Sequence, residues 1–290
     1  MIVAVTGGTG FVGQHILSAL QERGVSVRML VHTAPSTYKI PIFIGDTVTG
    51  QGLEPFLSGA DVLINLIGRY KPPFRLQYDL NVLSVYHLLQ AAAQAKIKKV
   101  IHMSSSAVYG SADKKSFREN DLLLPNTTYG LSKKSGEDIV EYFHRVYDLP
   151  YVMLRPTNIY GNGMSQGVIF GMIESLRSSG TIVVYGDGEQ VRDFVHVTDV
   201  TQLIMEALSG TDTQNGIYNV SGEEAVTLNE LAHTLQRIAG RDIMIRNTDV
   251  TDDSLRVLRS DSSKARRIFR WQPQVTLEKG LRELVLHTRP

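Results

Sequence analysis

Apolar positions in the first half of the chain alternate between short runs and helical spacing. Four short apolar runs are typical of buried strands: residues 2–5, 25–31, 61–67 and 99–102. Three longer stretches have the spacing of amphipathic helices: residues 11–23, 81–95 and 129–147. Periodicity alone does not separate a short buried strand from a buried helix, so the prediction rests on the alternation. It indicates an α/β fold, a doubly wound parallel sheet of the Rossmann type with helices on both faces.

The pattern loosens after Pro156. Glycines recur in the loops that follow, at Gly161, Gly163, Gly186 and Gly188. Two further helical stretches, residues 228–239 and 263–268, are mixed with short strands. We predict a dinucleotide-binding domain of residues 1–156 with roughly 191–222. Residues 157–190 and 223–290 would form a smaller, interleaved C-terminal α/β lobe that binds the substrate.

Composition and charge exclude several classes of protein. The 290 residues are 42% hydrophobic and 20% charged, and the net charge of +1 gives no broad basic surface for nucleic acid. The longest apolar runs, such as residues 62–67, are too short to cross a bilayer, and no basic region precedes the apolar N-terminus as in a signal peptide. Without cysteine, and with histidines outside metal-ligand spacing, we expect a cytoplasmic protein with no metal.

Glycines follow the first predicted strand at regular intervals. Gly7, Gly10 and Gly13 are spaced G-x-x-G-x-x-G, and Phe11 and Val12 open the next helix. Glycine lets the backbone turn tightly and approach a phosphate, while the start of a helix offers unpaired N–H groups and the positive end of its dipole. The strand–turn–helix context predicts a site for the pyrophosphate of a dinucleotide, and a tight turn without a ligand is the alternative.

The end of the second strand indicates which dinucleotide is bound. An acidic residue there would hold the ribose 2′-hydroxyl of NAD, whereas a basic residue would suit the 2′-phosphate of NADP. Residues 28–33 contain no acid, and the basic candidates nearby are Arg28, His32 and Lys39. The sequence therefore favours NADP(H) over NAD(H), with a solvated strand end as the alternative.

A tyrosine and a lysine stand four residues apart at the start of a predicted helix. Tyr129 and Lys133 share a helical face, and a neighbouring ammonium stabilises a phenolate and lowers its pKa. Such a phenol can exchange a proton with a substrate hydroxyl or carbonyl near neutral pH. A serine cluster, residues 104–106, follows the strand at 99–102, where the carboxyl edge of a parallel sheet binds ligands. The alternatives are a surface pair and a capped turn.

Together these residues resemble the extended short-chain dehydrogenases/reductases of the nucleotide-sugar epimerase/dehydratase/reductase family. The resemblance covers nearly the whole chain, and its motifs occur in the family's order. They are TGGTGFVG at 6–13, Asp46 after the third strand, Asn81-Val82 opening a helix, SSSAVYG at 104–110, YGLSK at 129–133, LRPTNIYG at 154–161, GDGEQVRDFVHVTDV at 186–200, DSSKA at 261–265 and WQP at 271–273.

The resemblance implies catalytic roles for three residues. Ser105 occupies the catalytic Ser/Thr position, Tyr129 would be the general acid/base, and Lys133 would hold the nicotinamide ribose and tune the tyrosine. Asp46 would face the adenine, and Asn81 would support the lysine from behind. The cofactor would also touch Gly7, Gly10, Phe11, Val12, Gly13 and His32.

Four residues are implied in binding the nucleotide sugar. Ser106 lies beside the catalytic serine, and Asn158 resembles the asparagine that reaches the substrate phosphates. Arg192 and Arg256 resemble arginines that clamp a pyrophosphate, a task that suits guanidinium geometry. For Arg256 an unremarkable surface charge is the alternative.

Departures from the family pattern narrow the chemistry. Dehydratases carry an Asp-Glu pair after the catalytic Ser/Thr, where this chain has Ser106 and Ala107, and epimerase–reductases use a cysteine that this chain lacks. Two activities at C4 of the sugar remain. One is NADPH-dependent reduction of a dTDP-4-keto-6-deoxyhexose or related sugar, and the other is NAD-dependent UDP-hexose 4-epimerisation. The absence of an acidic residue at the end of the second strand favours NADPH and therefore the reduction. A non-catalytic dinucleotide-binding regulator is a third reading, against which the complete Ser105, Tyr129 and Lys133 set argues.

Family members commonly dimerise through two helices, those that correspond here to residues 81–95 and 129–147. By this analogy we expect a homodimer with a four-helix interface.

Overall fold

A computed structural model describes residues 1–33, 38–110, 116–209, 215–240, 243–249 and 257–287. Its central element is a parallel sheet of seven strands in the order β10-β6-β5-β4-β1-β2-β3. The strands are β1 (Ile2–Thr6), β2 (Ser26–Val31), β3 (Ile42–Ile44), β4 (Val62–Asn65), β5 (Lys99–Met103), β6 (Tyr151–Pro156) and β10 (Gly216–Val220). The predicted doubly wound sheet is confirmed.

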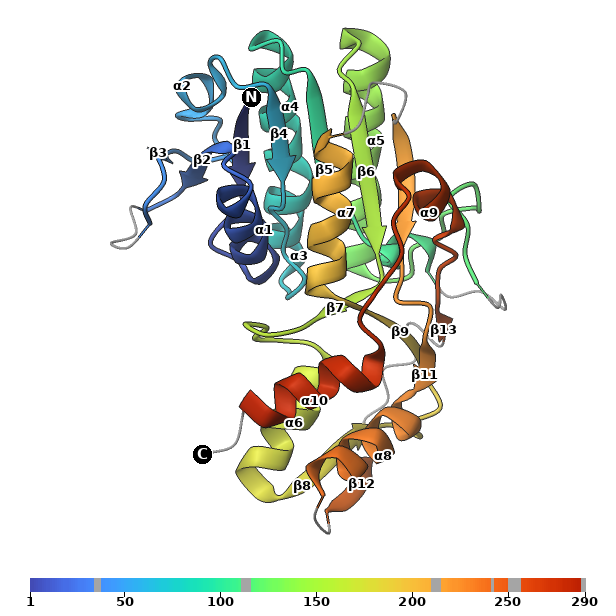
Figure 1. Ribbon diagram of the computed structural model, residues 1–290. Helices are drawn as coiled ribbons and strands as arrows, with labels where there is room; N and C mark the ends of the chain where they lie inside the picture. Colours follow the sequence, from blue (N-terminus) through green and yellow to red (C-terminus); the bar gives the residue numbers. More distant parts are fainter. Residues whose placement is uncertain (34–37, 111–115, 210–214, 241–242, 250–256, 288–290) are drawn as a thin grey trace.

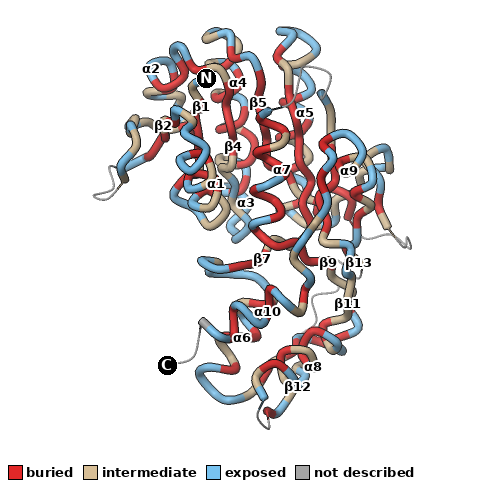
Figure 2. The backbone as a smooth tube through the Cα atoms, viewed as in Figure 1, coloured by how far each residue is buried: buried red, intermediate tan, exposed pale blue. Residues whose placement is uncertain are grey.

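Helices cover both faces of this sheet (Figure 1). One face packs on α1 (Phe11–Glu22), α7 (Val197–Ser209) and α9 (Ser263–Phe269), and the other packs on α2 (Leu53–Leu57), α4 (Ser84–Gln94) and α5 (Thr128–Tyr147). Three short helices complete this part: α3 (Phe74–Tyr78), the π-helix η1 (Asp79–Leu83) and the 3₁₀ helix η2 (Ser106–Tyr109). Burial is continuous along the central strands (Figure 2), as expected for a sheet covered on both sides.

A smaller lobe lies below the large sheet in Figure 1. It contains a sheet of β7 (Asn158–Tyr160), β9 (Val191–His196), β11 (Ala225–Thr227) and β13 (Val257–Leu258), and a pair of β8 (Thr181–Tyr185) and β12 (Met244–Thr248). Its helices are α6 (Val168–Ser179), α8 (Leu228–Ala239) and α10 (Leu277–His287). These elements share a hydrophobic core of their own.

The chain crosses between the two parts several times. From the predicted lobe, Ala265 and Phe269 of α9 and the following Trp271 are buried in the core of the large sheet. The division into two functional domains remains a prediction. Within the described residues, no helix is long and apolar enough to cross a membrane.

Candidate active site

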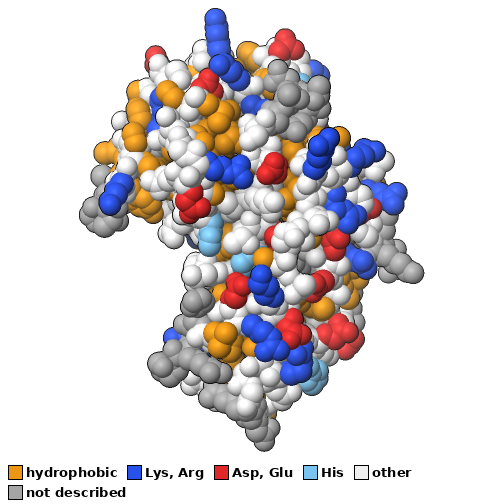
Figure 3. Space-filling view, in the orientation of Figure 1, with side chains coloured by type: hydrophobic (Ala, Val, Ile, Leu, Met, Phe, Trp, Pro, Cys, Tyr) orange, Lys and Arg blue, Asp and Glu red, His pale blue; other side chains and the backbone are white. Residues whose placement is uncertain are grey.

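The carboxyl ends of the parallel strands point toward the smaller lobe (Figure 1), and the molecular surface is hollowed at the level where the two parts meet (Figure 3). Ligands of open α/β sheets bind at this edge. Most of the residues singled out in the sequence lie on the loops and helix starts that leave it.

The glycine turn joins β1 to α1. A Cβ on Gly13 would lie 2.2 Å from the carbonyl oxygen of Gly7, so only glycine lets the helix approach the strand this closely. Gly7 itself has φ of +72°. Gly10 is the N-cap of α1, and because it has no side chain it cannot cap the N–H groups of the first turn. Phe11 and Val12 begin the helix and are partly exposed. The free N–H groups and the room around Gly10 suit a pyrophosphate.

The end of β2 differs from what the sequence indicates. The Arg28 guanidinium donates to the carbonyl oxygens of Phe56 and Ser58, both at 2.9 Å, so it is held at the end of α2. These bonds leave Arg28 a weaker candidate for a 2′-phosphate than its place in the sequence indicates. His32 follows β2 and is exposed, and Asp46 follows β3, where one carboxylate oxygen accepts a backbone N–H of its own turn at 2.7 Å.

Two of the three predicted catalytic residues are in direct contact. Ser105 is the N-cap of η2, Tyr129 lies in the first turn of α5, and their side chains form a hydrogen bond. Thr127 caps α5 by accepting from the Gly130 N–H at 3.0 Å, which fixes where the helix begins. Lys133 is buried one turn further along α5.

Burial separates the pKa values of the phenol and the ammonium. It raises the pKa of Tyr129 to about 12, although the bond from Ser105 acts the other way. Burial also lowers the pKa of Lys133 to about 8, which Glu137 partly opposes. The expected lowering of the phenol's pKa by the ammonium is not found, because Nζ of Lys133 donates to the Met103 carbonyl at 2.9 Å.

Asn81, on η1, joins the loop after β4 to the start of α5. Its side-chain oxygen accepts from the Arg69 N–H at 2.8 Å, and its amide group donates to the Arg69 carbonyl at 3.0 Å and to the Ser132 hydroxyl at 2.8 Å. Ser132 in turn donates to the Tyr129 carbonyl at 2.8 Å. A π-helix places the amide here, as such elements often do near functional sites.

A buried polar row that the sequence analysis missed crosses the ends of three strands. Thr6 of β1 donates to Asn65 of β4 at 2.8 Å, and the Asn65 amide donates to Nδ1 of His102 on β5 at 3.1 Å. Burial lowers the pKa of His102 to about 3, so the ring is neutral. The row lies on the strand residues beneath the catalytic loops and gives them a rigid base.

A buried ion pair, also missed, supports the serine loop. Arg155 of β6 makes two hydrogen bonds to the Glu137 carboxylate, at 2.9 and 2.7 Å. The same carboxylate accepts from the Ser104 hydroxyl at 2.5 Å. Arg155 also donates to the Tyr109 hydroxyl at 3.0 Å, and Tyr109 donates to Asn219 at 2.7 Å. The sequence signal was an arginine near the end of an otherwise apolar strand.

The predicted substrate residues lie on the lobe-facing side. Ser106 is buried, and its hydroxyl has no hydrogen-bond partner among the described residues. Asn158 of β7 donates to the Asp193 carbonyl at 2.9 Å, and Arg192 lies on β9, paired with β11 and β13. Arg256 lies outside the described residues.

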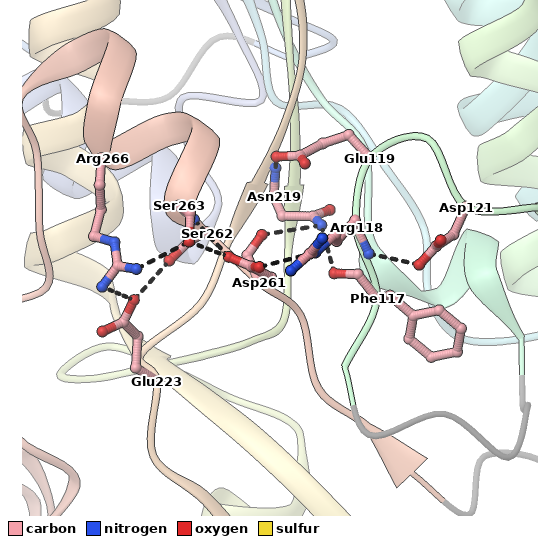
Figure 4. Close-up of polar contacts among 10 residues, drawn as sticks. All are labelled: Phe117, Arg118, Glu119, Asp121, Asn219, Glu223, Asp261, Ser262, Ser263 and Arg266. Atoms are coloured by element: carbon pink, nitrogen blue, oxygen red, sulfur yellow. Dashed lines mark hydrogen bonds and ion pairs between the residues drawn. The ribbon is translucent and has the colours of Figure 1, made fainter.

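A strap of polar contacts ties the C-terminal segment to the large sheet (Figure 4). Asp261 donates its N–H to the Phe117 carbonyl at 2.8 Å, and the Asn219 amide donates to the carbonyls of both residues. Further along, Arg266 on α9 pairs with Glu223 at 2.6 Å. The strap joins the segment that follows β13, a strand paired with β9 at Arg192, to Asn219 on the edge strand β10.

This fold and this site define a short-chain dehydrogenase/reductase-type enzyme of the nucleotide-sugar class, with a dinucleotide turn and a Ser–Tyr–Lys set at the same sheet edge. The family model described as "NAD dependent epimerase/dehydratase family" matches residues 3–221. The chain therefore belongs to the NAD-dependent epimerase/dehydratase family.

Relatives cover almost the entire chain. A UDP-glucose 4-epimerase of Mycolicibacterium smegmatis is 28% identical over 309 residues, which span 98% of this chain and 97% of that protein. Among solved structures, MoeE5 in complex with UDP-glucuronic acid and NAD is 28% identical with a TM-score of 0.92, covering 99% of both chains. A UDP-glucose 4-epimerase from Thermotoga maritima, with UDP-glucose, is 26% identical with a TM-score of 0.90, covering 99% of this chain and 98% of its own.

Proposed function

We propose that this enzyme is an NAD-dependent 4-epimerase of a UDP-linked hexose or hexuronate. The observation that carries the proposal is the bonded pair Ser105–Tyr129, with Lys133 one turn away and no acid at Ser106 or Ala107. That set provides a proton-transferring phenol at a sugar carbon but nothing placed to eliminate water. The names of the relatives support 4-epimerisation over the reduction that the sequence alone favours.

The residues divide the work of moving one proton. Tyr129 takes the proton of the sugar C4 hydroxyl, and Ser105 donates to the same oxygen while it becomes a carbonyl. Lys133, at a pKa near 8, has its ammonium on the Met103 carbonyl one helical turn from Tyr129, and we assign it to the ribose of the cofactor. When bound, NAD would supply reversible hydride transfer at C4, with return to the opposite face of the sugar. Tyr129 then gives the proton back, so the sugar changes configuration with no net redox change.

The choice of NAD over NADP rests on two observations. Arg28, the basic residue within β2, is engaged at the end of α2, and MoeE5 holds NAD in its structure. His32 is the basic side chain left close to the end of β2, and it is exposed. A 4-keto-sugar reductase remains the second candidate because no acid stands at residues 32–33 to grip the ribose hydroxyl.

The test uses UDP-glucose carrying deuterium at C4, with UDP-glucuronate as a second substrate. An NAD-loaded 4-epimerase converts each sugar to its C4 epimer with the deuterium retained, and no net NADH accumulates. Tyr129→Phe serves as the control and abolishes the conversion. Stoichiometric oxidation of NADPH by a dTDP-4-keto-6-deoxy sugar, without epimerisation of either UDP sugar, would overturn the proposal in favour of the reductase.

We also propose that the UDP-sugar lies against the lobe, with its phosphates near Asn158 and Arg192. The partly exposed side chain of Asn158 and the position of Arg192 on a strand between two partner strands are consistent with this. Arg192→Ala should weaken binding of the UDP-sugar while leaving NAD binding unchanged, as measured by calorimetry with each ligand.

The homodimer expected by analogy stays a proposal, and the surface of α4 and α5 supports it. Tyr86, Leu131, Tyr142, Val146 and Tyr147 are all exposed on these two helices. Apolar groups gathered on one face of a soluble protein are typical of an interface. Sedimentation of the wild type as a dimer and of Val146→Glu as a monomer is the expected result.

A further inference from the structure

An exposed tyrosine packs against the proposed catalytic phenol. The ring of Tyr70, in the loop between β4 and α3, lies with its centroid 5.1 Å from that of Tyr129 at an interplanar angle of 79°. This is the edge-to-face geometry that aromatic pairs favour. Tyr70 is nevertheless 56% exposed, so most of its ring borders open space.

Two buried amide side chains fix the backbone that presents this ring. Asn81 bonds both the N–H and the carbonyl of Arg69, and Gln77 donates to the Tyr70 carbonyl at 2.7 Å. Asn81 and Gln77 are 1% and 2% exposed. The Arg69 side chain adds bonds to the carbonyls of residues 71 and 72, at 3.0 and 3.3 Å. A loop tied at four successive residues holds Tyr70 in place rather than leaving it free.

The same amide ties the backbone of Tyr129. Asn81 donates to Ser132, which donates to the Tyr129 carbonyl. The backbone at Tyr129 and the backbone next to Tyr70 are therefore both bonded, directly or through Ser132, to one buried side chain. The two rings then meet edge to face above this common anchor. Their relative position is therefore set by the fold before any substrate binds.

The titratable groups around Tyr129 come from three elements. Tyr70 from the loop adds to the rise in the pKa of Tyr129 that burial causes, whereas the bond from Ser105 on η2 lowers it. Lys133, on α5 itself, directs its ammonium at the Met103 carbonyl. Among the neighbours that act on this phenol, Tyr70 is thus the one that opposes its ionisation.

We propose that Tyr70 is a positioning residue for Tyr129: its ring holds the phenol toward Ser105 and keeps water from that side of it. The proposal rests on the proposed function, since it assigns a task within proton transfer at C4. Proton transfer depends steeply on the distance and angle between donor and acceptor, so a phenol free to tilt would react more slowly. We assign this task to the ring of Tyr70, because the ring makes the contact with Tyr129.

The experiment compares three variants of the full-length, NAD-loaded enzyme. Tyr70→Ala removes the ring, Tyr70→Phe keeps it, and Tyr78→Ala is a matched control. Tyr78 is 45% exposed on the adjoining α3 and pairs with Phe74 instead of Tyr129. The first measurement is the pH dependence of kcat and KM with UDP-glucose. The second is the tyrosinate absorbance of each variant, from which the same background carrying Tyr129→Phe is subtracted.

Tyr70→Ala should lower kcat roughly three- to tenfold, the range expected for one aromatic pair, with KM changed by less than about twofold. Water reaching the phenol stabilises its charged form, so the acid limb of the profile and the Tyr129 titration should both move to lower pH. Tyr78→Ala should match the wild type in both measurements. Tyr70→Phe should match it in kcat and KM, and its Tyr129 titration should move less than in Tyr70→Ala, because only the charge effect of the Tyr70 hydroxyl is lost.

The possible outcomes separate this proposal from the proposed function. If the wild type epimerises UDP-glucose but Tyr70→Ala changes KM alone, or leaves the Tyr129 titration in place, Tyr70 does not position Tyr129. If Tyr70→Phe behaves like Tyr70→Ala, the hydroxyl rather than the ring acts, and the proposal is wrong. If no UDP-sugar is epimerised while the Tyr129 titration still shifts in Tyr70→Ala alone, the positioning role stands and the proposed reaction fails.

Discussion

Replacing Arg155 by methionine should destabilise the enzyme strongly, for reasons that can be worked out group by group. The Arg155 side chain and its partner Glu137 are 2% and 3% exposed. Arg155→Met would leave the Glu137 carboxylate buried with only the Ser104 hydroxyl as a donor, and would remove the donors to Tyr109 and to the Glu119 carbonyl. Burial opposes the charge of Arg155, yet its bonds to Glu137 hold its pKa above the usual value.

The expected loss follows from what is left unpaired. Breaking a buried ion pair by removing one partner costs about 3–5 kcal/mol, because the other charge stays in a dry site. At about 2–3 °C per kcal/mol for a chain of this size, the melting temperature should fall by about 6–15 °C. Arg155→Met/Glu137→Leu removes both charges and should recover at least about half of that loss, leaving mainly the cost of the unpaired Ser104 hydroxyl and of the Glu119 carbonyl without its donor.

Thermal unfolding followed by circular dichroism measures these differences. Arg282→Met is the matched control, because Arg282 makes the same kind of paired bonds to Glu278 at the surface. An exposed pair contributes little, so this control should melt within about 2 °C of the wild type. Two results would show that the pair does not stabilise the serine loop. One is a loss below about 1 kcal/mol in Arg155→Met, and the other is a loss in the double variant equal to the sum of the losses in Arg155→Met and Glu137→Leu.

Three further predictions concern chemistry, pH and cofactor choice. Tyr129→Phe should lower kcat for epimerisation by about 10²–10⁴-fold while its NAD affinity, measured by calorimetry, stays within about twofold. Burial raises the pKa of Asp193 from 3.8 to about 6, so the stability that this group contributes is present below pH 4 and is lost as the pH rises through 6. Between pH 4 and 6 the free energy of unfolding of the wild type should therefore fall relative to that of Asp193→Asn by up to about 3 kcal/mol, with a matching fall in the relative melting temperature. A difference that does not change with pH would contradict the raised pKa of Asp193. In fluorescence titrations, Arg28→Ala should leave the ratio of NADH to NADPH affinities unchanged, whereas His32→Asp should weaken NADPH binding more than NADH binding. A changed ratio in Arg28→Ala would show that Arg28 contributes to the choice of cofactor.

The alternation of apolar runs was sufficient to predict the doubly wound sheet, because a parallel strand buried on both faces has little choice of side chains. The spacing from Tyr129 to Lys133 likewise placed both residues on α5, since a helix fixes which side chains share a face. Spacing does not determine where a long side chain ends, however. Lys133 has a flexible stem, and its ammonium bonds the Met103 carbonyl in preference to meeting the phenol.

Features that depend on contacts between distant segments were not predictable. Arg28 looked like a cofactor residue because it lies on the second strand, but the carbonyls that bind it belong to a helix about thirty positions away. Tyr70 lies in a loop without periodicity, so nothing in its local sequence relates it to Tyr129. For the Arg155–Glu137 pair the sequence shows only an arginine in an otherwise apolar strand. That pattern does not identify Glu137 as the partner or indicate what the pair supports.

The charges at the site indicate that Tyr129 needs a further positive charge nearby before it can act as a base. A phenol with a pKa near 12 is neutral at physiological pH and is a poor base, and an ammonium with a pKa near 8 that bonds a carbonyl does little to change this. The dry environment that opposes a phenolate also strengthens its attraction to any positive charge brought close. Oxidised NAD carries such a charge on its nicotinamide ring and the reduced form does not. Tyr129 would then lose its proton more readily, and so be present as the base, when C4 has hydride to give. It would hold a proton, and so be present as the acid, when hydride returns. In the proposed epimerisation each redox state would thus favour the protonation state of Tyr129 that it needs.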